Sequence, residues 1–200
     1  MQKKWITLPP PPEEFINSHP ELPTIISRLL WNRNLRTQKQ IDEFLNPDYS
    51  QDVLDPFLFQ NMETATDIIL EAIKNQERIV VHGDYDADGV CAAAIIITCL
   101  RKLGSTNTHV FIPHRETDGY GLNTRTIELL AEQKTDLIIT CDCGISNYAE
   151  VELAKEKNIK VIITDHHTVP SKIPRADAII HPLVPQEPYP DKGLCGAGVA

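Results

Sequence analysis

The chain has 200 residues, of which 42% are apolar and 24% charged, a balance typical of a globular protein long enough to bury a core. Nineteen basic and twenty-eight acidic residues give a formal net charge of −9, so the overall charge does not indicate a nucleic-acid partner. A local basic patch can still oppose the net charge. The longest nearly apolar run, 90–100, is too short to cross a bilayer, and the five cysteines lack the spacing of a disulfide framework. We therefore expect a cytoplasmic protein that does not enter a membrane.

Residues 1–76 predict a small helical region. The proline run 9–12 predicts an extended polyproline segment. Apolar residues at helical spacing then predict helices over 24–35, 38–45 and 62–75. We interpret this region as a cap packed on its neighbour, with direct contact to a ligand as the alternative.

Residues 77–200 alternate between strand and helix patterns. Short β-branched runs predict strands over 79–82, 109–113, 137–140, 161–164 and 178–181. Helices are predicted between them over 90–103, 124–132 and 148–158. Such alternation indicates an α/β domain with a parallel sheet and helices on both faces.

Acidic and histidine side chains follow three of these predicted strands, in the stretches HGDYDAD, CDCG and DHH. In open α/β sheets, ligands bind at the carboxyl ends of the strands. A single Asp in such a place usually caps a helix, but three such clusters with paired histidines predict a metal site. The residues brought to this edge are His82, Asp84, Asp86, Asp88, Asp142, Asp165, His166 and His167.

So many candidate ligands favour two cations over one, and the mixture of imidazole and carboxylate suits manganese, with zinc or iron as alternatives. Magnesium prefers fewer histidines and more water. Asp142 is placed to bridge the two ions. Because His166 and His167 are adjacent, their side chains tend to point in different directions, so that one binds metal while the other faces the substrate.

Two other readings explain less of the first cluster. Residues 84–89 resemble the start of a calcium loop, but its twelfth position would be Ile95 rather than Glu. A phosphatase that uses Asp86 as a covalent nucleophile leaves His82 and the DHH triplet unexplained.

The stretches HGDYDADG at 82–89, the segment around Asp142 and DHH at 165–167 together resemble the DHH phosphoesterase superfamily. Within it, RNLRTQKQIDEFLNP at 33–47, IPHRETDGYGLN at 112–123 and YPDKGLCGAGVA at 189–200 are similar to the RecJ single-strand-specific exonucleases. The resemblance covers nearly the whole chain. It identifies residues 77–200 as a DHH domain and residues 1–76 as the region preceding it.

The resemblance also assigns roles. It implies metal ligands at His82, Asp86, Asp88, Asp142 and His166. It implies catalytic roles for His167 and Asp142, with Asp84 and Asp165 steadying the ligands. Arg115 is the candidate for DNA phosphate and Tyr120 for stacking on a base, with an exposed surface arginine and a packing tyrosine as the alternatives.

The implied activity is 5′-to-3′ hydrolysis of single-stranded DNA in recombination and repair, with two Mn²⁺ ions, or Mg²⁺ in their place. Single-strand-binding protein and a helicase are the implied protein partners. The alternatives are a DHH phosphodiesterase acting on oligonucleotides or cyclic dinucleotides, and an inactive DHH scaffold protein. DHH enzymes resemble one another in a fourth motif, an Asp beyond DHH, followed by a second domain. We expect both to lie outside these 200 residues, which would then be an incomplete DHH domain and inactive alone as a nuclease.

Overall fold

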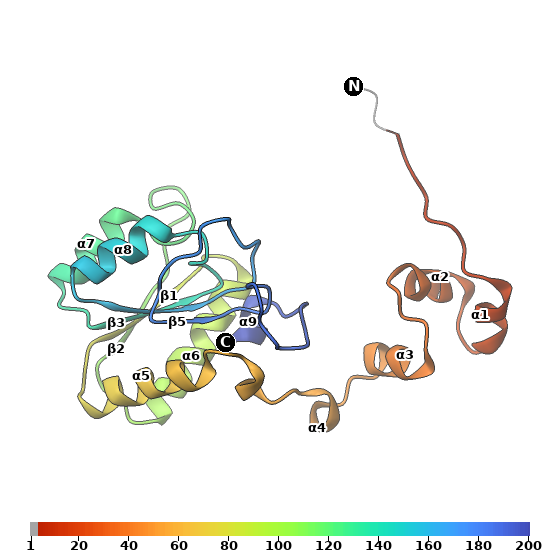
Figure 1. Ribbon diagram of the computed structural model, residues 1–200, viewed down its shortest axis with the longest axis horizontal. Coiled ribbons are helices and arrows are strands. Elements are labelled where there is room, and N and C mark those ends of the chain that lie inside the picture. Colours follow the sequence, from red (N-terminus) through yellow and green to blue (C-terminus); the bar gives the residue numbers. More distant parts are fainter. Residues whose placement is uncertain (1–3) are drawn as a thin grey trace. The chain divides into compact units, whose positions relative to one another are not determined.

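The computed structural model describes residues 4–200 and divides into two compact units, Met1–Leu54 and Asp55–Ala200. The first unit contains short helices, drawn in red and orange in Figure 1. They are α1 (Glu13–Ser18), α2 (Thr24–Asn32), α3 (Gln38–Leu45) and α4 (Tyr49–Asp52). Phe15, Leu30 and Ile41 form its apolar core. The helix predicted over 24–35 ends at Asn32, because Asn34 adopts a left-handed backbone with φ of 61°.

The second unit contains a sheet of parallel strands. After a 3₁₀ turn at Pro56–Leu58, its elements are α5 (Met62–Lys74), β1 (Ile79–Gly83), α6 (Ala87–Lys102), β2 (Thr108–Phe111), α7 (Thr124–Glu132), β3 (Leu137–Cys141), α8 (Tyr148–Glu156), β4 (Lys160–Thr164), β5 (Ala178–Ile180) and α9 (Gly196–Val199). The strand order is β2-β1-β3-β4-β5, and every neighbouring pair is parallel.

Helices cover both faces of this sheet, with α7 and α8 on one side and α5 and α6 on the other (Figure 1). The side toward α7 and α8 has a continuous apolar core, in which Val80, Ile138 and Val161 from three neighbouring strands contact Ile127 and Val151 of the two helices. All residues of β1 and β3 are buried, as expected for strands covered on both faces. The predicted α/β architecture is confirmed.

The strand order determines where the predicted ligands meet. β1 is followed along the chain by β2 on one side, whereas β3 lies on its other side. The connections that leave β1 and β3 therefore run in opposite directions, which makes the carboxyl ends of these two strands a topological switch point, the place where open α/β sheets bind ligands. The HGDYDAD stretch follows β1 and Asp142 follows β3, so the predicted ligands lie at this switch point.

The division after Leu54 groups α5 with the sheet, where it contacts β5. The boundary between residues 76 and 77 stays a prediction about where the DHH domain begins. Between residues 4 and 200, no helix combines the length and the apolar character needed to cross a membrane.

Candidate metal centre

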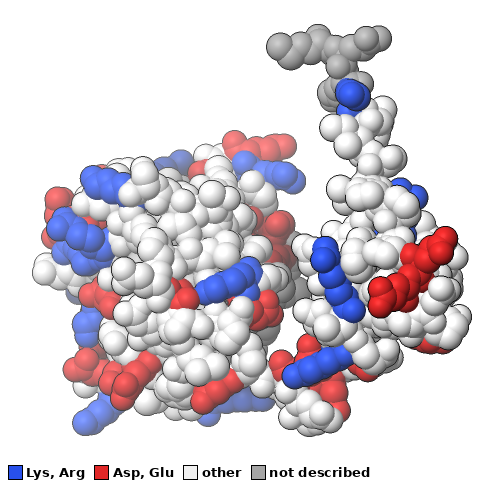
Figure 2. All heavy atoms as spheres, turned by 45° about the vertical axis from the view of Figure 1, so that its right-hand side comes forward, with Lys and Arg blue, Asp and Glu red and all other residues white. Residues whose placement is uncertain are grey.

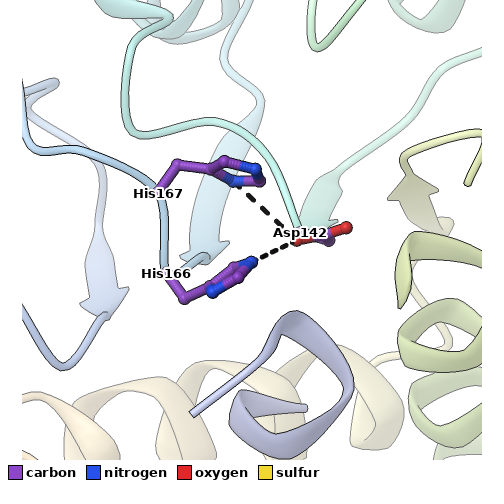
Figure 3. Close-up of side chains that lie close together, drawn as sticks. All are labelled: Asp142, His166 and His167. Atoms are coloured by element: carbon purple, nitrogen blue, oxygen red, sulfur yellow. Dashed lines mark ion pairs between the residues drawn. The ribbon is translucent and has the colours of Figure 1, made fainter. Parts of the chain in front are cut away.

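Carboxylate and imidazole groups converge where β1, β3 and β4 end. Asp142, His166 and His167 form one group, which we call the histidine set (Figure 3). Asp84, Asp86 and Asp142 form a second group, the carboxylate set. Within each set, one ligand atom from every member lies within 4.8 Å of the others. Because Asp142 belongs to both sets, a single carboxylate lies between two places suited to a cation.

The position of Asp142 depends on an unusual backbone and on a close neighbour. Its φ is 61°, in the left-handed region of the backbone that residues other than glycine rarely adopt. Its N–H donates to Thr164 O of β4 at 3.0 Å, which ties the turn to the next strand. A Cβ on Gly196 would lie 2.5–2.6 Å from the Asp142 side chain. Only glycine at 196 therefore allows α9 to approach this carboxylate.

Three buried polar atoms in the described part of the chain lack a hydrogen-bond partner at this edge: His82 Nε2, Asp84 Oδ1 and Asp142 Oδ1. His166 Nε2 lies 3.0 Å from Asp142 Oδ1, an ion-pair distance, but without the geometry of a hydrogen bond. Buried polar groups are normally satisfied, so orphaned ligand-type atoms beside two ligand sets fit the binding of divalent cations.

The pKa values agree with this interpretation. Burial, and then the charge of Asp88, raise the pKa of Asp142 above its usual range, and burial raises the pKa of Asp84 as well. Burial lowers the pKa of His82 to about 4, so its imidazole is neutral and free to act as a ligand at neutral pH. Cations at this edge would offset the cost of ionising the crowded carboxylates.

Asp86 and Asp88 also cap helices. Asp86 Oδ1 accepts from the N–H groups of Asp88 and Gly89 at 2.9 and 3.0 Å and thereby begins α6, three residues before the predicted start. The Asp88 carboxylate accepts from Gly196 N and Ala197 N, both at 2.7 Å. Burial alone would raise the pKa of Asp88, but these hydrogen bonds outweigh it and lower the pKa.

His82 lies inside the sheet rather than in either set. It is fully buried on β1, its ring stacks on Phe111 with centroids 5.3 Å apart, and Nδ1 lies 3.7 Å from Cys143 Sγ. Asp88 Oδ2 is 3.6 Å from His166 Nε2, and Asp88 likewise belongs to neither set. The structure thus gathers Asp86, Asp142 and His166 of the predicted ligands and leaves His82 and Asp88 outside both sets. Metal binding by all five residues stays a prediction.

Asp165 organises the DHH segment. Its Oδ1 accepts from His166 N at 2.7 Å, His167 N at 3.1 Å and His167 Nδ1 at 2.8 Å, and its Oδ2 accepts from Ile145 N at 2.9 Å. Burial favours the neutral His167 ring, but the hydrogen bond that the ring donates to Asp165 and the charges of Asp165, Asp142 and Asp84 outweigh it and raise the pKa of His167. These contacts support the steadying role predicted for Asp165. Asp84, for which the same role was predicted, lies within the carboxylate set instead.

Arg115 and Tyr120 lie on the loop between β2 and α7. The exposed Arg115 places its guanidinium 5.0 Å from the ring centre of Tyr85, in the loop after β1. Tyr120 directs its hydroxyl toward the site, 3.1 Å from His167 Nδ1 and 3.2 Å from Asp142 O. Stacking of Tyr120 on a base and phosphate binding by Arg115 stay predictions.

The sequence reasoning did not single out Asn147. Its side chain holds the Tyr120 loop through Leu122, with Nδ2 donating to Leu122 O at 2.9 Å. An Asn just before a helix is an ordinary cap signal, so its sequence position gave no sign of this long-range contact.

Comparison with known proteins places this geometry in a family. Residues 78–200 match the DHH family, N-terminal domain. The single-stranded-DNA-specific exonuclease RecJ of Haemophilus influenzae is 36% identical over 185 residues, which are 92% of this chain and 31% of that protein. RecJ of Bacillus subtilis is 40% identical over 176 residues, 88% of this chain and 22% of that protein. This chain therefore spans less than a third of either relative.

Solved structures similar to this chain are also of RecJ exonucleases. A crystal structure of exonuclease RecJ bound to manganese superposes with a TM-score of 0.67 and 38% identity, covering 74% of this chain and 37% of that one. RecJ from Thermus thermophilus in complex with Mn²⁺ gives a TM-score of 0.66 and 33% identity, covering 96% of this chain and 26% of that one.

Proposed function

The chain belongs to the DHH family, and we propose that it carries the metal centre of an exonuclease that hydrolyses single-stranded DNA from the 5′ end. The observation that supports this most directly is the position of Asp142 in both the histidine set and the carboxylate set. Its relatives in Haemophilus influenzae and Bacillus subtilis are RecJ exonucleases, and the proposal concerns the protein to which these 200 residues belong.

We propose two Mn²⁺ ions as cofactors, with Mg²⁺ as the alternative. Asp142 would contact both, with His166 of the histidine set on one and Asp86 of the carboxylate set on the other. His82 and Asp88 are the further candidate ligands, since His82 Nε2 has no hydrogen-bond partner and Asp88 lies next to His166. When bound, the ions would supply Lewis-acid activation of the phosphodiester and of the attacking water.

The chain's own residues position the reaction. Asp165 holds the His167 ring through Nδ1, which leaves the other ring nitrogen for a proton or for the substrate. We propose His167 and Asp142 as the catalytic groups, because they lie together at the carboxyl end of the sheet.

We propose that Arg115 binds a phosphate of the strand. Its side chain is exposed and near the site, where its charge opposes the rise in the pKa of Asp84. On the face shown in Figure 2, Lys and Arg are interspersed with Asp and Glu over the second unit, so no broad basic surface appears there. Individual contacts at the carboxyl ends of the strands would therefore have to orient the DNA.

The setting in the cell is also part of this proposal. We propose a role in recombination and repair, in the reducing cytoplasm, which suits five free cysteines. A single-strand-binding protein and a helicase as partners rest on the resemblance alone.

The test uses the full-length protein in Mn²⁺ with DNA strands labelled at one end. A 5′-labelled single strand should release labelled mononucleotide at once, while a 3′-labelled strand releases its label last and blunt duplex persists. Asp142→Asn, which keeps the shape but removes the charge shared by the two sets, should abolish release.

Two other outcomes of these assays would support the alternative functions. Release first from the 3′ end, or faster cleavage of cyclic dinucleotides, would favour the DHH phosphodiesterase. Absence of hydrolysis combined with absence of Mn²⁺ binding in calorimetry would favour the scaffold protein.

A further inference from the structure

The loop that carries Tyr120 is firmly held. Gly119 and Gly121 flank the tyrosine with φ of 77° and 74°, a backbone that glycine adopts without strain. Asn147 Nδ2 donates to Leu122 O at 2.9 Å, and Leu122 N donates back to Asn147 Oδ1 at 3.3 Å. A Cβ on Gly121 would lie 2.7 Å from Asn147 Oδ1. The loop that carries the tyrosine is therefore held by hydrogen bonds to the residue that precedes α8.

The Tyr120 hydroxyl reaches two residues of the site at once. It donates to Asp142 O at 3.2 Å and lies 3.1 Å from His167 Nδ1. The tyrosine and histidine rings also meet edge to face, with centroids 5.7 Å apart and planes at 74°. The tyrosine is 46% exposed, whereas its polar end is directed into the site.

The available protons allow one consistent set of hydrogen bonds among Tyr120, His167 and Asp165. His167 Nδ1 lies 2.8 Å from Asp165 Oδ1, and an ionised carboxylate can only accept, so Nδ1 carries the proton. Tyr120 has a single hydroxyl proton, which it donates to Asp142 O. Its oxygen must then accept from His167 Nδ1–H, which is shared between Asp165 and Tyr120.

We propose that Tyr120 is a positioning residue that holds the His167 ring at Asp142, by bridging the Asp142 carbonyl oxygen and His167 Nδ1 with its hydroxyl. Asp165 fixes which ring nitrogen carries the proton, and Tyr120 fixes the plane of the ring. In the neutral form of the ring, the lone pair is thereby on Nε2. The consequence for turnover rests on the proposed function, but the hydrogen bonds do not.

This role differs from stacking on a nucleobase. Stacking needs only the aromatic ring, and so Tyr120→Phe would preserve it. Positioning needs the hydroxyl, and so Tyr120→Phe would remove it. Tyr120→Leu removes both, which makes the pair of variants diagnostic. Tyr49→Phe is the matched control, because Tyr49 is 86% exposed in the first unit.

The first measurement uses NMR of the metal-free protein with ¹⁵N-labelled histidine, and follows exchange of the His167 Nδ1 proton with water. Loss of one hydrogen bond should speed this exchange by about fivefold in Tyr120→Phe and leave it unchanged in Tyr49→Phe. The second measurement is turnover of single-stranded DNA in Mn²⁺. We expect Tyr120→Phe to lower kcat about fivefold to tenfold, with KM within about twofold of wild type.

The inference is overturned if Tyr120→Phe keeps wild-type proton exchange and wild-type kcat. A rise in KM confined to Tyr120→Leu would also overturn it, in favour of base stacking. If the wild-type protein does not cleave DNA but the exchange rate still rises in Tyr120→Phe, the proposed function fails and the positioning role stands.

Discussion

His82 should make the metal-free protein lose stability on acidification. Burial lowers the pKa of His82 in the folded state to about 4, whereas the unfolded chain has the ordinary value of 6.5. Below pH 6.5 the unfolded chain takes up a proton at this histidine that the folded protein cannot accept. Stability from this group is therefore complete above pH 6.5 and is lost as the pH falls toward 4.

The size of the loss follows from the two pKa values. The interval between 6.5 and about 4, at about 1.4 kcal/mol for each pH unit, sets a limit of about 3.5 kcal/mol, of which about 3 kcal/mol is lost by pH 4. This is a large fraction of the stability of an ordinary domain, which is about 5–15 kcal/mol. His82→Asn removes the titration while leaving a polar side chain at the same place on β1.

The assay is urea denaturation in the presence of a chelator, at neutral pH and at about pH 4. Wild type should lose about 3 kcal/mol more than His82→Asn between the two conditions. His114→Asn, at an exposed position, serves as the control and should follow wild type. Equal losses in wild type and His82→Asn would refute the reasoning, because they would show that His82 protonates as readily in the folded protein as in the unfolded chain.

Further variants test the site and the core. Asp142→Asn should lower Mn²⁺ binding at both places, since Asp142 belongs to both sets, and activity should fall at least about 100-fold; calorimetry and nuclease assays measure these. Gly196→Ala should destabilise by about 1–3 kcal/mol in urea melts, because its Cβ would lie 2.5–2.6 Å from Asp142. Gly198→Ala, whose nearest neighbour at 3.3 Å is the end of a leucine side chain, should cost less. Ile139→Ala, a fully buried position of β3, should cost about 2–5 kcal/mol by the same measurement.

The sheet could be predicted because its strands carry an unambiguous local signal. The runs beginning at 79, 137 and 161 are short, β-branched and buried on both faces, and the observed β1, β3 and β4 agree with the predictions within one residue at each end. The short helix α9 depends more on contacts that are distant in sequence. Gly196 and Gly198 are poor helix formers, and Gly196 and Ala197 donate to Asp88, more than a hundred residues away in sequence.

The candidate site could be predicted at the level of strand ends but not of hydrogen bonds. A sequence pattern places Asp84, Asp142 and His166 after three strands, and parallel pairing makes these ends neighbours. It does not show that Asp142 adopts a left-handed backbone. Nor does it show that the Tyr120 hydroxyl reaches His167, because that contact depends on the conformation of a loop.

The order of the strands explains why the charge is concentrated rather than spread along the edge. The three strands that lead into the predicted site residues, β1, β3 and β4, are neighbours in the middle of the sheet. The outer strands β2 and β5 lead instead into Ile112 and His181, and burial lowers the pKa of His181, which keeps that ring neutral at neutral pH. The residues that directly follow these outer strands thus add no charge that would relieve the repulsion among the central carboxylates. The fold places Asp142 where ionisation is costly without an opposing charge, and cation binding would couple directly to the stability of this edge.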